Sequence, residues 1–429
     1  MSDIESRTLA IFGGPKTINK QFPLYNPLGI EEVDAAKAVI ESGVLSKYIG
    51  AWHPDFYGGP KVREFEAECA KFFGVKHVIT VNSWTSGLVA AVGAIGIGPG
   101  DEVITTPWTM SATATAILHW NGIPVFADIN RDTFNLDLDS VERNITEQTK
   151  AIISVDIFGM SSDMDEIMLL AQKYNLKVIS DTAQGPGAKY KGRYAGTSAD
   201  IGGFSLNYHK HIHTGEGGIL VTDDDVLAER MQLIRNHAEV VVGEKGVEDL
   251  TNMVGHNFRL GEIECAIGIE QLSKLPRLVK ERQMLAQGLT LELSGLPYLQ
   301  TPIIADDRDH AYYVYPLIVD VDGLGVTRDR LCDALQAEGL SVMRRYQNIH
   351  LLPMYQKKIA FGKSGFPWNS DFCKRNVVYD KGICPVAEEL NDETFLGIGM
   401  CVFDLDMGDI ALIGKVFKKV WANLNVLKD

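Results

Sequence analysis

The stretch NYHKHIHTGEGG, residues 207–218, places three histidines around a single lysine, Lys210, just before a glycine-rich turn. On a strand, His209, His211 and His213 would share one face and could hold a metal ion. Zinc requires a further cysteine, histidine or carboxylate ligand, and the sequence offers none at a readable spacing. The segment also lacks the GxxxxGK[ST] pattern of a Walker phosphate loop. We therefore expect no metal and interpret Lys210 as a reactive amine.

A second candidate lies in KVISDTAQGPGAKYKG, where Asp181 follows a short apolar run. Sheets of α/β proteins place ligand-contacting residues at the carboxyl ends of their strands. Asp181 is therefore a candidate site residue, with Gln184 three positions later. The alternative interpretation, that Asp181 caps the next segment, is equally compatible with the sequence.

A third candidate is VNSWTSGLVAAVG, where a strand ends at Val81 and small, hydroxylated residues precede a helix. Backbone N–H groups at a helix N-terminus, together with the hydroxyls of Thr85 and Ser86, form a natural phosphate site. Taken alone, this segment is more simply interpreted as an ordinary helix cap.

Together, the three stretches match the chemistry of pyridoxal 5′-phosphate (PLP). A lysine amine forms a Schiff base with the aldehyde of PLP, and a buried aspartate keeps the pyridine nitrogen protonated. The helix N-terminus would hold the phosphate. Lys210, once displaced by an amino substrate, would move the proton between carbon atoms.

Short apolar strands alternate with helical patterns from about residue 60 to residue 220. This alternation predicts an α/β fold with a mainly parallel sheet covered by helices on both faces. We expect an N-terminal arm at residues 1–30, a large PLP-binding domain at 31–285 and a smaller α+β domain at 286–429. In the small domain, SVMRR (residues 341–345) is predicted to be a strand.

The 429 residues carry a formal net charge of -15, with 45% hydrophobic and 23% charged residues. Such an acidic chain repels phosphate backbones and anionic membranes, so we expect neither nucleic acid nor membrane as a partner. The six cysteines form no CxxC pair. The N-terminus has neither the basic start nor the apolar region of a signal peptide, so a cytoplasmic location is expected.

Several blocks of the sequence resemble, in order, those of the DegT/DnrJ/EryC1/StrS family of PLP-dependent sugar aminotransferases. Among them are GIGPGDEVITTP, VISDTAQGPGAKYKGRYAGTSADIGGFS, KHIHTGEGG and GHNFRLGEIECAIGIEQLSKL. The resemblance implies PLP-dependent transferase fold type I, with a seven-stranded type of sheet, and a homodimer with shared active sites. It also implies site residues: Lys210 for the Schiff base, Asp181 and Gln184 at the pyridine ring, Thr85, Ser86 and Ser205 at the phosphate, and Asn257 at the phosphate of the neighbouring subunit.

The sequence departs from the family pattern at two positions. Where relatives stack an aromatic residue on the cofactor ring, this chain has Met110, with Trp108 two residues earlier as the other candidate. Where many relatives have histidine in a VHxxG segment, this chain has Asp156. One branch of the family replaces the lysine by histidine and dehydrates sugars, so the retained Lys210 favours amino transfer.

The resemblance implies a ping-pong reaction in which glutamate donates an amino group to a sugar carbonyl. The whole chain most resembles enzymes that aminate 8-oxo-3-deoxy-manno-octulosonate (8-oxo-Kdo), a lipopolysaccharide sugar. Arg344 and Arg345 could bind its carboxylate bidentately, with His211 nearby, although surface charges are an equally simple interpretation. The alternatives are a nucleotide-linked keto-6-deoxy sugar or another free or phosphorylated ketosugar or cyclitol as the acceptor, a PLP-dependent sugar dehydratase, and a PLP-binding sensor without turnover.

Overall fold

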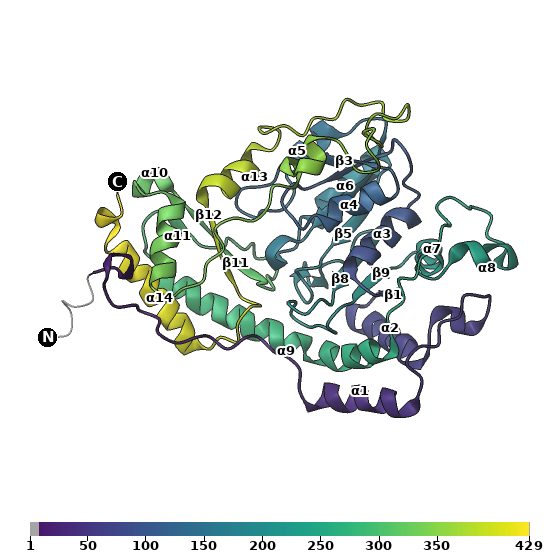
Figure 1. The fold of residues 1–429 in the computed structure, drawn as a ribbon, viewed down its shortest axis with the longest axis horizontal. Coiled ribbons are helices and arrows are strands. Elements are labelled where there is room, and N and C mark those ends of the chain that lie inside the picture. Colours follow the sequence, from purple (N-terminus) through teal and green to yellow (C-terminus); the bar gives the residue numbers. More distant parts are fainter. Residues whose placement is uncertain (1–7, 429) are drawn as a thin grey trace.

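The structure is a computed structural model, and it describes residues 8–428. Within these residues the chain forms a seven-stranded sheet in the order β1–β9–β8–β5–β4–β2–β3 (Figure 1). The strands are short and almost completely buried, as expected for a sheet covered on both faces. Their bounds are β1 His77–Val81, β2 Glu102–Thr105, β3 Ile123–Phe126, β4 Thr149–Val155, β5 Lys177–Asp181, β8 Ile201–Ser205 and β9 Gly218–Thr222.

Strand β9 is the one strand of this sheet, as described, that runs against the others. It pairs antiparallel with both β1 and β8, whereas the remaining pairs are parallel. β8 and β9 are joined directly by residues 206–217, the stretch that contains Lys210. The predicted fold class, α/β with a mainly parallel sheet, is confirmed.

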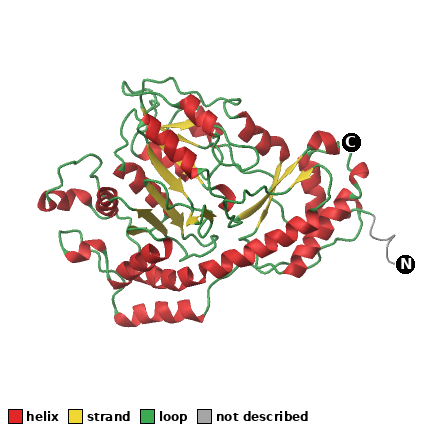
Figure 2. Cartoon of the chain, turned by 180° about the vertical axis from the view of Figure 1, so that it is seen from behind, coloured by secondary structure: helices red, strands yellow, loops and turns green. Residues whose placement is uncertain are grey.

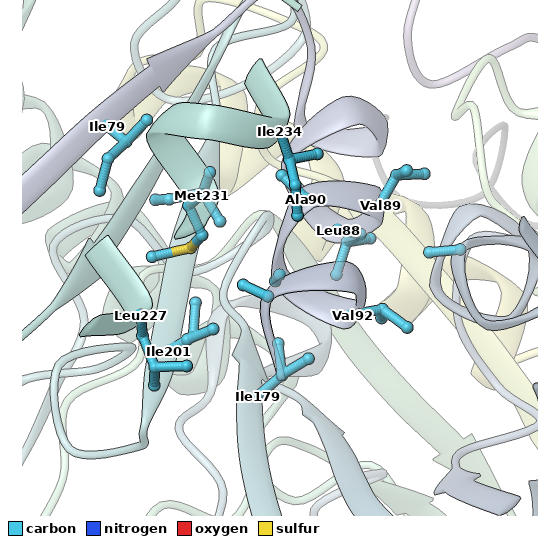
Figure 3. Packing of buried hydrophobic residues seen from close by; sticks show 14 of the residues in the cluster. Ile79, Leu88, Val89, Ala90, Val92, Ile179, Ile201, Leu227, Met231 and Ile234 are labelled. Carbon is cyan, nitrogen blue, oxygen red and sulfur yellow. The ribbon is translucent and has the colours of Figure 1, made fainter. Parts of the chain in front are cut away.

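Helices cover both faces of the sheet, and Figure 2 shows them in red around the yellow strands. Helix α3 is apolar on nearly all sides and lies in the centre of the core. Its Leu88, Ala90 and Val92 belong to one apolar cluster with Met231 and Ile234 of α7 and Ile179 of the sheet, and Ala90 lies on the side of α7 (Figure 3). The helices are α2 Pro60–Phe73, α3 Trp84–Ala94, α4 Ala112–His119, α5 Leu138–Asn144, α6 Met164–Tyr174, α7 Asp225–Arg235 and α8 Ala238–Lys245.

The C-terminal part of the chain has its own antiparallel sheet, in the order β10–β11–β12, and its own apolar cluster. A separate two-stranded ribbon, β6–β7, lies in the large domain. The strands are β10 Leu299–Gln300, β11 Val314–Val319, β12 Phe395–Gly399, β6 Lys189–Tyr190 and β7 Arg193–Tyr194. The helices are α10 Val321–Leu324, α11 Arg328–Ala337, α12 Pro353–Gln356, α13 Pro385–Glu389 and α14 Met407–Trp421.

One long helix, α9 (Glu262–Leu293), connects the two parts (Figure 1). Leu275 and Leu278 pack into a cluster under the large sheet, whereas Ala286 and Leu289 belong to the C-terminal cluster. The predicted boundary at residue 285 therefore falls inside a continuous helix, and the division into domains stays a prediction.

The predicted N-terminal arm precedes helix α1 (Ile30–Ser42), which lies along α9 (Figure 1). Residues 1–7 of the arm lie outside the described residues. Leu9 and Ile18 pack into the C-terminal cluster, so the arm is bound to that part of the molecule. In residues 8–428, no helix combines the length and apolar character needed to cross a membrane.

The prediction of a strand at residues 341–345 is wrong. The segment makes a single bridge, between Met343 and Gly397. The next hydrogen-bonded pair of this ladder would join residues 345 and 395, but the carbonyl of Phe395 accepts a hydrogen bond from the guanidinium of Arg328 at 2.8 Å. A buried side chain thus takes the group that a neighbouring strand would need.

Candidate active site

A cavity of about 310 Å³ opens near the carboxyl ends of β4, β5 and β8. Carboxyl ends of strands are where α/β sheets bind their ligands. Polar and apolar side chains from both parts of the chain line the cavity. They include Ser83, Trp84, Thr85, Thr109, Met110, Thr113, Val155, Asp181, Gln184, Ser205, Asn207, His209, Lys210, Glu216, Tyr313 and Tyr346.

Lys210 lies on the loop that connects β8 and β9, so the three histidines do not share the strand face that a metal site would have required. The backbone N–H of Lys210 donates to the carbonyl of Asn207 at 2.9 Å, forming a tight turn. The base of the loop is closed by a hydrogen bond from the N–H of Leu206 to the carbonyl of Gly217. From the N-terminal arm, the hydroxyl of Tyr25 donates to the carbonyl of His211 at 2.6 Å. The lysine is therefore fixed from several sides.

The amine of Lys210 is held in a poorly solvated position. The residue is 7% exposed, and Nζ lies 4.4 Å from the centre of the Tyr313 ring. Burial lowers the pKa of Lys210 to about 8, with Asp181 opposing the shift. A lysine with this pKa supplies more neutral, nucleophilic amine near neutral pH than an exposed lysine does.

Asp181 ends β5, and its carboxylate is 3% exposed. Oδ1 accepts a hydrogen bond from the indole Nε1 of Trp84 at 2.7 Å, and Oδ2 accepts one from the hydroxyl of Thr113 at 2.8 Å. Burial raises the pKa of Asp181, while these two donors lower it. The indole reaches the carboxylate by crossing β8 at Gly203, where an added Cβ would lie 2.1 Å from a ring carbon of Trp84.

Asp156 lies directly after β4 and is completely buried, although it does not line the cavity. Its carboxylate accepts hydrogen bonds from the hydroxyl of Thr182 and the N–H of Ser162 at 2.7 and 2.8 Å. The N–H of Asp156 donates to the carbonyl of Asp181. Burial raises the pKa of Asp156 to about 6. Asp156 therefore supports the strand end that carries Asp181.

The predicted phosphate site is at the start of α3, where Ser83 caps the helix by accepting from the N–H of Ser86. Thr85 and Ser205 line the cavity there. Ser86 does not, because its hydroxyl donates to Asn82 at 2.7 Å and lies 2.9 Å from the hydroxyl of Ser83. The structure thus places Thr85 and Ser205 at the cavity and engages Ser86 in the cap.

Of the residues predicted to contact the cofactor ring, Gln184 and Met110 line the cavity and Trp108 does not. Gln184 lines the cavity, where its carbonyl accepts from the N–H of Phe158 and its amide donates to the hydroxyl of Tyr346 at 2.8 Å. Met110 also lines the cavity and is 60% exposed. Trp108 is completely buried among aromatic side chains and is not part of the wall. Of the two candidates for the ring face, only Met110 is placed to reach a ligand.

Four other candidates are not brought to this cavity. His211 is fully buried, and its Nε2 lies 2.8 Å from the carbonyl of Ala311. Arg344 contacts Asp333 and Gln336, and Arg345 is bound to Asp329. Asn257 is exposed, and its side-chain oxygen accepts from Arg259. The two arginines are surface charges in this chain, and the role of Asn257 at a neighbouring subunit stays a prediction.

Four residues that line the cavity were not predicted from the sequence, namely Trp84, Thr113, Tyr313 and Tyr346, and His209 was considered only as a metal ligand. Trp84 had a local signal, because an indole at the first position of α3 starts beside the strand ends. No local signal indicated Tyr346, because it lies 162 residues after its hydrogen-bond partner Gln184 in the sequence. Residues 8–428 contain no group of three or more His, Cys, Asp or Glu side chains arranged to hold a metal ion.

The cavity residues fit PLP. A poorly solvated lysine amine and a buried carboxylate share one cavity, and a helix N-terminus with two hydroxyl residues adjoins it. PLP, when bound, supplies an aldehyde for the amine and an electron-accepting ring. Asp181 and Gln184 would hold the ring, and Thr85 and Ser205 the phosphate. Fold and site together define a PLP-dependent transferase.

Comparison with known proteins identifies the family of PLP-dependent enzymes to which the chain belongs. Residues 51–398 match the profile of the DegT/DnrJ/EryC1/StrS aminotransferase family. The chain is 37% identical over 369 residues to the spore coat polysaccharide biosynthesis protein SpsC of Bacillus subtilis, covering 84% of this chain and 92% of the relative. It is 36% identical over 298 residues to GDP-perosamine synthase of Caulobacter vibrioides, covering 69% and 79%.

A solved structure of GDP-4-keto-6-deoxymannose-3-dehydratase, with a trapped PLP-glutamate geminal diamine, superposes with a TM-score of 0.73. It is 25% identical, and the match covers 92% of this chain and all of the dehydratase chain. The chain belongs to the DegT/DnrJ/EryC1/StrS aminotransferase family, and it is a PLP-dependent aminotransferase.

Proposed function

We propose that the protein transfers an amino group from glutamate to the carbonyl of a nucleotide-linked keto-6-deoxy sugar. The observation that carries the proposal is the pair formed by Lys210 and Asp181, which face one cavity from neighbouring strand ends. Lys210 is placed to move a proton at the carbon that gains or loses nitrogen, because its depressed pKa suits both acid and base roles. Asp181 would pair with a protonated ring nitrogen, and the hydrogen bonds from Trp84 and Thr113 favour its charged form.

The choice of acceptor is supported by the relatives and by the cavity wall. Both GDP-perosamine synthase and the GDP-sugar dehydratase are named for nucleotide-linked sugars. The physical argument for 8-oxo-Kdo was a cation for its carboxylate, and Arg344 and Arg345 are not at the cavity. Lys210 is the one lysine or arginine among the residues that line it. The wall thus gives no specific support to 8-oxo-Kdo, and the names of the relatives favour the nucleotide-linked sugar as the acceptor.

A homodimer is part of the proposal. The exposed Asn257 lies outside the cavity of its own chain, so a phosphate contact by this residue would be made to another chain. The expected result is a dimer in sedimentation velocity. An Asn257→Ala variant should remain dimeric but bind PLP more weakly.

The test is to incubate the purified protein with PLP, glutamate and either GDP-4-keto-6-deoxymannose or 8-oxo-Kdo, and to analyse products by mass spectrometry. Gain of one nitrogen by the GDP-sugar supports the proposal. Nitrogen gain only with 8-oxo-Kdo would reverse the choice of acceptor, and loss of water without nitrogen would indicate the dehydratase. No product with any keto sugar, despite PLP binding, would indicate a sensor. Lys210→Ala should abolish transfer, whereas the matched control Lys150→Ala, an exposed lysine on β4, should not.

A further inference from the structure

The three histidines around Lys210 have different environments. The ring of His211 is buried beside the carbonyl of Ala311, and Nδ1 of His213 accepts from the N–H of Gly215 at 3.3 Å. His209 alone of the three lines the cavity. Across residues 8–428, neither ring nitrogen of His209 has a hydrogen-bond partner.

The ring of His209 lies between two tyrosines. Its centre is 5.0 Å from that of Tyr208 and 6.0 Å from that of Tyr313. Tyr313 also carries the amine of Lys210 over its ring. His209 and Lys210 therefore border the same aromatic surface, and a molecule that reaches the amine passes close to the imidazole.

The imidazole is neutral at the pH at which the enzyme would work. Partial burial and the charge of Lys210 lower the pKa of His209 to about 4. A neutral imidazole offers one N–H donor and one acceptor nitrogen. Such a group can bind a sugar hydroxyl, which is itself both donor and acceptor.

Most other polar groups of the wall already have partners. The carboxylate of Asp181 is bound by Trp84 and Thr113, and Gln184 is bound at both ends of its amide. The side-chain NH₂ of Asn207 donates to Glu216 at 2.9 Å, whereas its side-chain oxygen is buried and has no partner among the described residues. His209 is thus a wall group with hydrogen-bonding capacity left for a substrate.

We propose that His209 is a specificity-determining residue that binds a hydroxyl of the sugar acceptor beside the carbonyl that receives the amine. This inference rests on the proposed function. A glutamate carboxylate could accept from the N–H of the imidazole but could not donate to its other nitrogen, so we expect the main effect of His209 in the half-reaction with the sugar. A site that hydrogen-bonds a substrate hydroxyl strongly favours substrates that carry it.

The test measures the two half-reactions separately, through the visible absorbance of the PLP-loaded enzyme. On the proposed function, glutamate should bleach the yellow colour and GDP-4-keto-6-deoxymannose should restore it. The variant His209→Phe keeps a ring but removes both hydrogen-bonding nitrogens, and His209→Asn restores one donor and one acceptor. His77→Phe, at the amino end of β1, is the matched control.

For His209→Phe we expect bleaching by glutamate within about 2-fold of wild type, because the main effect of the imidazole is on the sugar. The KM for the sugar should rise roughly 10-fold, as for loss of one hydrogen bond, and His209→Asn should recover part of it. If His209→Phe slows both half-reactions equally, or leaves the KM for the sugar unchanged, the inference is overturned. Thermal unfolding of each variant separates a folding defect from an effect on the sugar. Failure of the wild type itself to bleach would remove the proposed function and this inference with it.

Discussion

The indole of Trp84 controls the charge of Asp181, and this can be measured. The substitution Trp84→Phe removes one of two side-chain donors that bind this buried carboxylate, at 2.7 Å. A hydrogen bond to a charged group contributes about 1.5–3 kcal/mol. At 1.36 kcal/mol per unit, its loss raises the pKa of Asp181 by roughly 1–2 units, in the direction in which burial has already shifted it.

The consequence appears in PLP affinity, because only ionised Asp181 stabilises a protonated ring nitrogen. As pH falls through the pKa of Asp181, affinity is lost, so a raised pKa moves this loss to higher pH. We expect the midpoint of affinity against pH to move up by about 1–2 units, with roughly 10-fold or more weaker binding near the midpoint. The assay is absorbance titration of cofactor-free protein with PLP from pH 5 to pH 9.

Trp120→Phe is the matched control, because its buried indole donates to the carbonyl of Val89, also at 2.7 Å. It changes volume and removes an indole hydrogen bond without touching Asp181. The reasoning is refuted if both variants weaken PLP equally, or if the midpoint for Trp84→Phe stays where it is in the wild type.

Three further predictions concern other buried groups. Burial lowers the pKa of Lys210 from 10.5 to about 8, so the charged lysine destabilises the folded state. Lys210→Met should therefore raise the free energy of unfolding of cofactor-free protein by about 3 kcal/mol below pH 8. Urea denaturation should show that this gain disappears near pH 10.5. Burial raises the pKa of Asp156 to about 6, so the free energy of unfolding of the wild type should fall by about 3 kcal/mol as the pH rises from 4 to 6. In the same assay, Asp156→Asn should not show this dependence on pH. Tyr346→Phe leaves the amide of Gln184 without its acceptor and should cost about 1–2 kcal/mol in thermal unfolding; an unchanged stability would contradict this.

The α/β fold class could be predicted from the sequence because the signals of its strands and helices are local. Strands such as β1 and β5 are short apolar runs between polar turns, and a covered parallel sheet requires that pattern. Asp181 ends β5, and Lys210 lies on the loop that follows the neighbouring strand β8, so the topology brings both to one cavity. The antiparallel β9 was not predicted, since strand direction depends on pairing over long distances.

The sequence could not predict which side chains reach the cavity from distant parts of the chain. Tyr313 and Tyr346 reach the cavity from the C-terminal part, and no local pattern indicates this. The expectation for Arg344 failed because charge type alone does not say which way a side chain points. The guanidinium of Arg344 instead donates a hydrogen bond to Asp333 on helix α11. Ser86 matched the expected residue type, but the helix cap used its hydroxyl.

The position of β9 between β1 and β8 also has a consequence for the order of events on the ribosome. β1 ends at residue 81, and its hydrogen-bonding partner begins only at residue 218. At about 5–20 residues per second, translation leaves β1 without that neighbour for on the order of 10 s. During this time the helices α2 and α3 must cover the strand. The loop with Lys210 is then completed by the same step that closes the sheet, so a nascent chain cannot capture PLP before its first strand is paired.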